Sequence, residues 1–516
     1  MNKIKSFQSQ NKERMCINVA FLFFIFFCFS LFLFKCHSIS IFDTDDWAYL
    51  MFTRRAAFFP SVKEWNPIKI LPENLMPLAS WFGYYVGMML TDNLYDSIVL
   101  GMNVTLALFV SLFCSLCMRA IKKILTLNYF ESVIIGLCCF FFCFIPCIKK
   151  NNVCYNFFWA PGATIVFNYA IPTLFNCLLV FLSIIHEDKL KCFFKKKHII
   201  CKVVYLILIY LAIYSNLYSN VVLASYAGVK ILQYLFVENK KNTVFSAKKW
   251  LECSVYIYTL VLFFFSLIFE ANGGRAKIAE GNPFCLKASI KMLVHTFFFE
   301  KNVVFNVIIF ASVVFYFLML IRLLCSKLFV RIESERMKLF KVYVNYASLC
   351  FFNVVFTMAY LVLLSGKVGA RYLESPSVQL DYYLFFLLNI LMVLGYFFKY
   401  HKRTIHVCVV FLFFFIALFL HVGGKIAEYN VWSLSNRTCK SLFCFIIQQY
   451  VEADEKNKES VSVRVPFFNS SDNYPIANYG GPRLSKALYK YGLISKPLKA
   501  ELVIDKSVNE LFGIKP

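Results

Sequence analysis

Long apolar runs, separated by short segments rich in Lys and Arg, are the feature that most constrains how this chain can fold. An α-helix needs roughly 20 residues to cross the hydrocarbon core of a bilayer. Runs near that length lie at about residues 17–35, 96–118, 131–148, 165–185, 203–216, 219–237, 253–270, 303–325, 343–365, 381–399 and 404–421. The sequence therefore predicts an all-α polytopic membrane protein with about 11 transmembrane helices.

The composition supports this class. Of the 516 residues, 60% are hydrophobic, 61 are Phe and only 16% are charged. A soluble domain carries more charge and fewer apolar residues. The formal net charge of +25 would suggest a nucleic-acid partner in a soluble protein. Here the basic residues lie between the apolar runs, so we interpret them as topology signals and expect no nucleic-acid partner.

The basic clusters also predict sidedness. With an odd number of spans they all fall on one side, which the positive-inside rule makes cytoplasmic. We therefore expect a cytoplasmic N-terminus, a transmembrane domain with catalytic outer loops at 1–421, and a small C-terminal outer domain at 422–516. The run at 17–34 is too long for the apolar part of a cleaved signal peptide, and no small-residue cleavage site follows it. The segment Tyr214–Asn220 is either a tight outer turn or a polar break within a helix; a turn keeps every basic cluster on one side.

An acidic cluster follows the first apolar run, at the start of a long first outer loop. Asp43, Asp45 and Asp46 lie there, immediately before Trp47. A carboxylate at a membrane boundary can deprotonate a hydroxyl if burial or a neighbouring charge tunes its pKa. The structural alternative is a helix start, because Asp and Thr are common N-caps. We predict catalytic roles for the three carboxylates.

Two more outer loops combine glycine with basic residues. They read Asn272–Lys277 and Gly366–Tyr372, and they contain Arg275, Lys277 and Arg371. Glycine lets a backbone approach a ligand closely, and Arg binds phosphate through two parallel hydrogen bonds. The alternative is an ordinary helix C-terminus, where basic side chains interact favourably with the helix dipole. We predict that these three residues bind substrate.

Further substrate-binding candidates lie in the first loop and in the tail. Trp47 follows the acidic cluster, and Glu73 lies just before an amphipathic segment at 75–92, which could lie in the membrane interface. Arg483 follows Gly480-Gly481-Pro482 in the tail and could reach an acceptor or lipid phosphate. A solvated basic face is the alternative reading of that tail segment.

No cofactor is expected from the sequence. The chain has no Walker or Rossmann glycine signature, and no Cys or His spacing typical of zinc. Most of the 20 Cys fall within spans or on the predicted cytoplasmic side, where thiols stay reduced. Cys439 and Cys444 fall on the predicted outer side and could pair.

Several motifs in order resemble those of the serotype-converting O-antigen glucosyltransferases of enteric bacteria, the phage-type family that uses polyprenyl-phosphate glucose. The resemblance rests on Asp43–Trp47, Asn66–Pro67, Leu71–Asn74, Asn272–Ala276 and Arg483–Tyr489, and it extends over the whole chain. Each motif is short, and their order and sidedness carry the match.

This resemblance implies a glycosyltransferase-C-like fold in the bacterial inner membrane, with the C-terminus in the periplasm. The donor would be undecaprenyl-phosphate glucose, made by a donor synthase and brought across the membrane by a flippase. The acceptor would be the lipid-linked O-antigen repeat, whose glucosylation causes serotype conversion. An Asp of the Asp45–Asp46 pair would activate the acceptor hydroxyl, and Arg275 or Arg371 would neutralise the departing phosphate. The scheme requires no metal.

Other functions remain open at this stage. A lipid-linked sugar flippase or transporter would place charges along a path within the spans, and such charges are few. An O-antigen polymerase would more often have its large outer loop between spans of the second half. An acyltransferase would need a His base near the membrane surface, for which His295 and His421 are the candidates.

Overall fold

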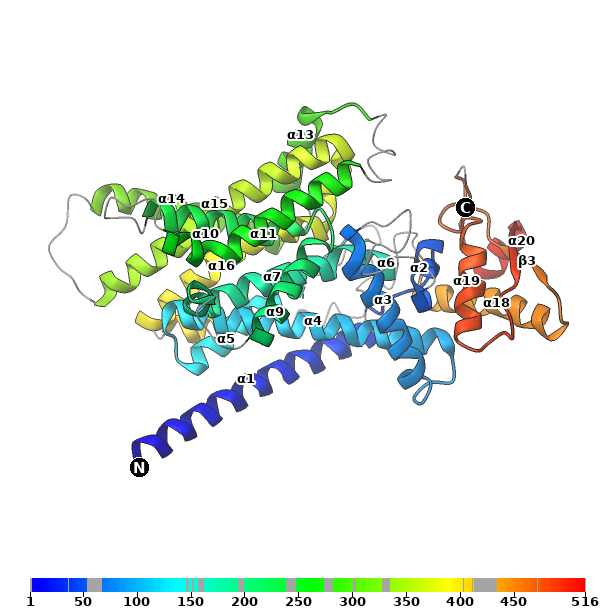
Figure 1. Cartoon of the computed structure of the whole chain (residues 1–516), viewed down its shortest axis with the longest axis horizontal. Coiled ribbons are helices and arrows are strands. Elements are labelled where there is room, and N and C mark those ends of the chain that lie inside the picture. The colour runs from blue at the N-terminus through cyan, green and yellow to red at the C-terminus, as the bar shows by residue number, and fades with distance from the viewer. Residues whose placement is uncertain are drawn as a thin grey trace.

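The structure is a computed structural model that describes residues 2–35, 37–52, 67–144, 148–150, 153–155, 162–193, 199–237, 247–272, 282–299, 303–326, 335–401, 403–410, 412, 434–470 and 472–515. Figure 1 shows a bundle of long helices with a smaller C-terminal unit at one end, beside the short helix α2.

The first half of the chain is almost wholly helical. Its elements are α1 (Asn2–Lys35), α2 (Thr44–Ala48), η1 (Leu50–Phe52), η2 (Pro67–Lys69), α3 (Ile70–Phe82), η3 (Gly83–Gly87), α4 (Leu94–Leu125), α5 (Tyr129–Phe144), β1 (Ile148–Lys150), β2 (Val153–Tyr155), α6 (Ala163–Ile165), η4 (Val166–Ala170), α7 (Ile171–Ile185), α8 (Glu187–Lys191), α9 (Ile199–Ile213), α10 (Asn220–Leu232) and η6 (Gln233–Val237).

The second half adds further long helices and the C-terminal unit. Its elements are α11 (Ala247–Ala271), α13 (Leu286–Phe299), α14 (Val303–Ser326), α15 (Glu335–Val368), η7 (Ala370–Glu374), α16 (Pro376–Tyr400), α18 (Asn436–Glu455), β3 (Ser460–Val465), α19 (Gly480–Lys490), β4 (Lys499–Ile504) and α20 (Lys506–Phe512).

The class of an all-α membrane protein is confirmed. Within the described residues, 6 helical stretches are long and apolar enough to cross a membrane: Met15–Lys35, Leu94–Leu125, Ala163–Ile185, Trp250–Ala271, Leu339–Val368 and Pro376–Tyr400. Shorter apolar helices lie at Tyr129–Phe144, Ile199–Ile213 and Phe305–Met319. The count of about 11 spans and the glycosyltransferase-C-like fold stay predictions.

Helix α4 forms the axis of the half of the bundle that carries the acidic cluster. Its N-cap is Asn93, whose side chain accepts hydrogen bonds from backbone N–H groups of the first turn. Lys122 and Lys123 lie in its last turn, where the helix dipole stabilises cations. The helix packs against α1, α5 and α7. At 32 residues it is about 48 Å long, so its two ends lie far apart.

Aromatic side chains fill the contacts around α4. The ring of Phe113 lies 5.7 Å from that of Phe144 on α5 and 5.2 Å from that of Phe181 on α7, both edge to face. Gly101 lets α3 lie directly against α4, because a Cβ at this position would be only 2.2 Å from the carbonyl oxygen of Ala79. The Phe-rich composition thus serves packing between helices as well as contact with lipid.

The segment Tyr214–Asn220 is a turn between helices. α9 ends at Ile213 and α10 begins at Asn220, which confirms the turn rather than a break within one helix. The amide side chain of Asn216 accepts from the Tyr218 N–H at 2.8 Å and donates to the carbonyl of Asn168 at 2.5 Å. Side-chain hydrogen bonds therefore satisfy backbone groups where the helices stop.

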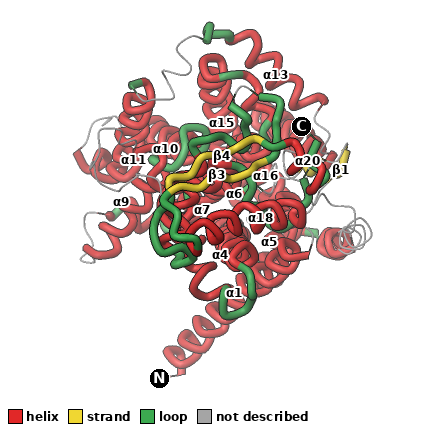
Figure 2. The backbone as a smooth tube through the Cα atoms, turned by 90° about the vertical axis from the view of Figure 1, so that its right-hand side faces the viewer, coloured by secondary structure: helices red, strands yellow, loops and turns green. Residues whose placement is uncertain are grey.

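The C-terminal unit surrounds a two-stranded parallel sheet, seen in front of the bundle in Figure 2. Ser460 pairs with Lys499 and Val465 with Ile504. The side-chain amide of Gln449 on α18 bonds both the N–H and the carbonyl of Arg464, so it covers part of the outer edge of β3. The predicted domain boundary at 421–422 lies outside the described residues.

Candidate functional site

The acidic cluster forms the short helix α2 just beyond α1. Asp43 is its N-cap, and its Oδ1 accepts from the Asp46 N–H at 2.7 Å. Asp46 Oδ2 in return accepts from the Asp43 N–H at 3.3 Å and the Phe42 N–H at 2.8 Å. This reciprocal capping lets a helix of only five residues form at the end of a membrane span. Asp43 therefore has the capping role that the sequence offered as an alternative.

Asp46 also ties α2 to the bundle. Its Oδ1 accepts from the N–H of Thr164 on α6 at 2.7 Å, and the residue is only 1% exposed. Burial raises its pKa to about 6, although its hydrogen bonds with Thr164, Phe42 and Asp43 oppose the shift. Burial also raises the pKa of Asp43, assisted by the charge of Asp46. Because both oxygens of Asp46 already accept hydrogen bonds, its geometry favours a structural role.

Asp45 is partly exposed, as Asp43 is, but unlike Asp43 its side chain caps no helix. Its Oδ1 accepts from the hydroxyl of Tyr479 at 3.1 Å. Its Oδ2 has no hydrogen-bond partner, and the side chain forms no ion pair, among the residues that the structure describes. Asp45 thus combines a fixed orientation with one carboxylate oxygen that accepts no hydrogen bond from the described residues.

Tyr479 connects Asp45 to Arg483, so the structure brings two predicted site residues from distant parts of the chain together. The guanidinium carbon of Arg483 lies 4.9 Å from the centre of the Tyr479 ring, in cation–π range. Burial and the adjacent Asp45 raise the pKa of Tyr479 to about 12. The hydroxyl therefore stays protonated near neutral pH and donates to Asp45.

Close backbone contact holds the tail against α2. The N–H and the hydroxyl of Thr44 both donate to the carbonyl of Pro475, at 3.0 and 3.1 Å. Gly480 begins α19 directly over α2, and a Cβ there would lie 2.2 Å from Thr44 Cγ2 and 2.9 Å from Trp47 Cε3. Only glycine fits this approach, which positions Tyr479 beside Asp45.

A second set of contacts fixes the chain between α1 and α2. The hydroxyl of Tyr95 on α4 accepts from the Ile41 N–H at 3.3 Å and donates to Asn436 on α18 at 2.6 Å. Lys440 on α18 forms an ion pair with Asp96 on α4. The chain before the acidic helix is thus anchored to the first turns of α4 and α18.

The remaining predicted residues are more scattered. Trp47 is 1% exposed and packs beneath Gly480, which favours a packing role for its ring. Glu73 is buried in the first turn of α3. Arg371 is exposed on η7 and forms no hydrogen bond or ion pair within the described part of the chain.

Some predictions fall on residues that the structure does not place. Arg275, Lys277 and His421 lie outside the described residues, so the predicted phosphate loop at 272–277 stays a prediction. His295 lies on α13, a helix within the segment expected to be an outer loop.

The possible pairing of Cys439 with Cys444 is wrong. Both are free thiols on α18. Residues five apart on an α-helix point about 140° apart, so the two sulfurs face different surroundings. Cys439 is buried near the acidic cluster, and Cys444 Sγ lies 3.3 Å from the side-chain amide of Asn93.

Sequence reasoning missed the residues that assemble the site, namely Tyr479, Tyr95 and Thr164. Tyr479 directly precedes the paired glycines of the tail, and that position is its signal in the sequence. Tyr95 and Thr164 have no such signal. Within the described residues, no group of three or more His, Cys, Asp or Glu side chains is arranged to hold a metal ion.

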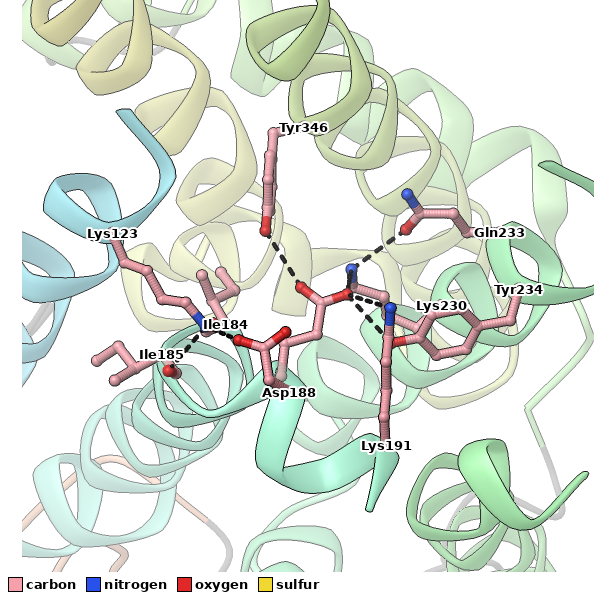
Figure 3. Close-up of polar contacts among 10 residues, drawn as sticks. Lys123, Ile184, Ile185, Asp188, Lys191, Lys230, Gln233, Tyr234 and Tyr346 are labelled. Atoms are coloured by element: carbon pink, nitrogen blue, oxygen red, sulfur yellow. Dashed lines mark hydrogen bonds and ion pairs between the residues drawn. The ribbon is translucent and has the colours of Figure 1, made fainter. Parts of the chain in front are cut away.

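A second carboxylate cluster lies at the opposite end of α4, and Figure 3 shows its polar contacts. Glu187 Oε1 lies 3.0 Å from Lys230 Nζ and accepts from the Tyr234 hydroxyl at 3.1 Å. Its Oε2 accepts from the Tyr346 hydroxyl at 3.2 Å. We call Glu187, Lys191, Lys230, Tyr234 and Tyr346 the ion-pair cluster. It joins α8 to α10, η6 and α15.

Lys123 extends this charged end of the bundle. It pairs with Asp188 at 3.1 Å and donates to the carbonyl of Ile185 at 3.0 Å. Burial alone would raise the pKa of Glu187, but Lys230 and the other donors hold it below its ordinary value. The basic end of α4 is thus distinct from the end that carries α2.

Fold and site together define a helical membrane protein with an acidic helix at one end of the bundle and a docked C-terminal unit. Searches against protein-family models, curated proteins and solved structures found no match to this chain.

Proposed function

We propose that the chain is a membrane glucosyltransferase that moves glucose from undecaprenyl-phosphate glucose to a lipid-linked O-antigen repeat. The single observation that carries the proposal is the state of Asp45. It is an oriented carboxylate without a cationic partner among the described residues, and it lies just beyond the first membrane span. A general base for a lipid-borne hydroxyl needs this combination of reach, orientation and a free oxygen.

The proposed chemistry is a displacement at the anomeric carbon of the donor. Asp45 Oδ2 takes the proton of the acceptor hydroxyl while the hydroxyl oxygen forms a bond to that carbon. The bond between the carbon and the polyprenyl phosphate oxygen breaks, and the phosphate leaves with the electron pair. Asp46 and Tyr479 act as positioning residues, because one fixes α2 and the other fixes the Asp45 carboxylate.

The departing phosphate needs positive charge. Arg483 is linked to Asp45 through Tyr479, whose ring it stacks over and whose hydroxyl donates to Asp45. Arg371 has an exposed guanidinium without an ion-pair partner in the described part of the chain, and Arg275 remains a sequence-based candidate. We expect the phosphate to be bound by one or more of these three residues.

The proposal also requires α2 to face the periplasm. The ends of α4 support this orientation, because Lys122 and Lys123 lie at the end opposite to the acidic helix. A periplasm-active reporter fused after Lys515 should be active, and one inserted near Lys196 should not. The reverse pattern would place Asp45 in the cytosol and would contradict the proposed reaction.

The activity itself is tested in an O-antigen-bearing bacterial host that makes undecaprenyl-phosphate glucose. Expression of the wild-type chain should add one glucose to each O-antigen repeat, detected by mass spectrometry and glycosyl-linkage analysis of the lipopolysaccharide. Asp45→Asn should accumulate in the membrane to the same level and add none. Unchanged O-antigen with the wild-type chain, in hosts that offer several different repeat structures, would contradict the proposal.

A further inference from the structure

A second unpaired carboxylate lies inside the bundle. Asp381 is the sixth residue of α16 and falls within the candidate membrane span Pro376–Tyr400. It is fully buried, with no exposed surface. An ionisable side chain at such a place marks a functional site more often than a structural one.

Its immediate partners are all oxygen atoms. Asp381 Oδ1 accepts from the hydroxyl of Thr173 on α7 at 2.9 Å, and Asp381 Oδ2 has no hydrogen-bond partner among the described residues. The Thr173 oxygen also lies 3.0 Å from the hydroxyl of Ser219 and 3.4 Å from the carbonyl of Ser377. The Ser377 hydroxyl is itself buried without a partner in the described part of the chain.

No positive charge compensates this carboxylate within the described structure. It forms no ion pair with any described residue, and the nearby titratable side chains include Cys177 on α7 and Tyr360 on α15, neither of which can become a cation. The α16 dipole does not replace a cation, because its effect falls off within the first helical turn, and Asp381 lies beyond that turn.

Two further buried acceptors in neighbouring helices are unused within the described part of the chain. Asn176 Oδ1, on the same helix as Thr173, and Asn220 Oδ1, next to Ser219, are buried without donors among the described residues. Their amide nitrogens already donate to backbone carbonyls, at 2.9 and 3.1 Å, so the amide orientations are fixed. An all-oxygen environment with unused acceptors suits a small cation.

We propose that Asp381, with Thr173, Ser219 and Ser377, forms an intramembrane site that holds a small cation, either a proton or a sodium ion. The physical reason is that a bare carboxylate in a dry interior costs far more free energy than one neutral hydrogen bond returns. Either cation removes that cost: the proton by covalent bonding to Oδ2, and sodium by coordination to oxygen. This proposal does not rest on the glucosyltransferase activity.

The test is the thermal stability of the purified full-length protein in lipid nanodiscs. Sodium chloride is compared with choline chloride at equal ionic strength, at mildly acidic and mildly alkaline pH. If the site binds sodium, the wild-type melting temperature should be higher in sodium chloride than in choline chloride. If it binds a proton, the melting temperature should rise only as pH falls. The expected shift is about 2–4 °C.

Asp381→Asn should remove that dependence, because the neutral amide needs no cation. Asp92→Asn changes an exposed carboxylate and should keep the wild-type responses. Thr173→Val removes one oxygen without changing charge and should weaken the response, which provides a test if Asp381→Asn fails to fold. Equal responses to sodium and to pH in the wild type, Asp381→Asn and Thr173→Val would overturn the proposal.

Discussion

Two carboxylates near opposite ends of α4 differ in how many hydrogen-bond and ion-pair partners they have. At one end Glu187 meets Lys230 and the hydroxyls of Tyr234 and Tyr346, so both of its oxygens are engaged. At the other end Asp45 meets a single tyrosine hydroxyl and no cation among the described residues. A carboxylate whose oxygens are both engaged, as in Glu187, joins helices, whereas under the proposed function the second oxygen of Asp45 takes the proton of the acceptor.

The two regions should therefore fail in different ways. The central pair of the ion-pair cluster lies largely inside the bundle, since the side chain of Lys230 is only 2% exposed and that of Glu187 14%. Removing one partner leaves the other charge buried and unpaired, which lowers stability. Altering Asp45 leaves no buried charge behind, so we expect chemistry to be lost while the fold remains.

The largest stability effect should come from Lys230→Met. It leaves Glu187 buried without its main cation, and we expect the free energy of unfolding to fall by about 3–5 kcal/mol. Glucose transfer per folded molecule should stay near the wild-type level. Chemical denaturation of the purified protein measures the first quantity and a transfer assay the second.

Lys191→Met is the matched control for this variant. Lys191 lies 3.8 Å from Glu187 and its side chain is 29% exposed, so its loss should cost much less. Equal destabilisation by both substitutions would show that the buried Glu187–Lys230 pair does not dominate the stability of this cluster.

The pH dependence of stability should have opposite signs in the two regions. Burial raises the folded-state pKa of Asp46 from 3.8 to about 6, so its stabilising contribution is complete below about pH 3.8 and is lost as pH rises through about 6. The difference corresponds to about 3 kcal/mol. The pKa of Glu187 is lowered instead, so its contribution is present above its ordinary pKa of 4.5 and is lost as pH falls below it.

Thermal melts across pH would reveal this contrast by subtraction. The free energy of unfolding of the wild type minus that of Asp46→Asn should decrease from pH 4 to pH 7. The decrease should be on the order of 3 kcal/mol, the difference given above. Wild type minus Glu187→Gln should show stability that decreases toward acid. Slopes of the same sign in both subtractions would contradict the assigned environments.

Gly480→Ala should uncouple the tail from α2. The new Cβ would clash with Thr44 and Trp47, and overpacking of this kind costs about 1–3 kcal/mol. We expect faster proteolysis of the C-terminal unit and reduced transfer, because Tyr479 moves away from Asp45. Gly492→Ala is an informative control, since a Cβ there meets nothing within 4 Å, although its φ of 72° adds some strain. A fully active, protease-resistant Gly480→Ala protein would show that the tail does not position the site.

Tyr479→Phe should have a small effect. It removes only the hydroxyl that donates to Asp45, which is typically worth about 0.5–1.5 kcal/mol. We expect a several-fold lower turnover number with little change in the Michaelis constant for the donor. Tyr489→Phe, on an exposed ring of the same helix, should be neutral. If both variants behave like the wild type, Asp45 is oriented by other contacts.

The sequence allowed much of the fold to be predicted, because apolar periodicity and length depend on local composition. The helices at 94–125, 163–185 and 376–400 lie close to the expected spans. The amphipathic segment expected at 75–92 overlaps α3 and η3, whereas α13, within an expected outer loop, was not predicted as a separate element, because the stability of such a helix depends on packing.

The site was predicted only in part, for a physical reason. Asp43, Asp45 and Asp46 are adjacent in sequence, so their clustering needs no tertiary information. The division of roles among them does, since it depends on Thr164 and on Tyr479, which are far away in the chain. No local pattern shows that Asp46 has both oxygens engaged, that Asp43 caps α2, and that Asp45 is held by Tyr479.

The most direct test of the account measures transfer of labelled glucose from undecaprenyl-phosphate glucose to lipid-linked O-antigen in membranes that contain equal amounts of each protein. Asp45→Asn should lower the rate about 100- to 10,000-fold, as expected for loss of a general base, while its melting temperature stays at the wild-type value. Glu187→Gln should show the reverse, with lower thermal stability and nearly normal transfer per folded molecule. Near-normal transfer by Asp45→Asn, or a loss of transfer in Glu187→Gln as large as that in Asp45→Asn, would contradict the assignment of chemistry to the acidic helix.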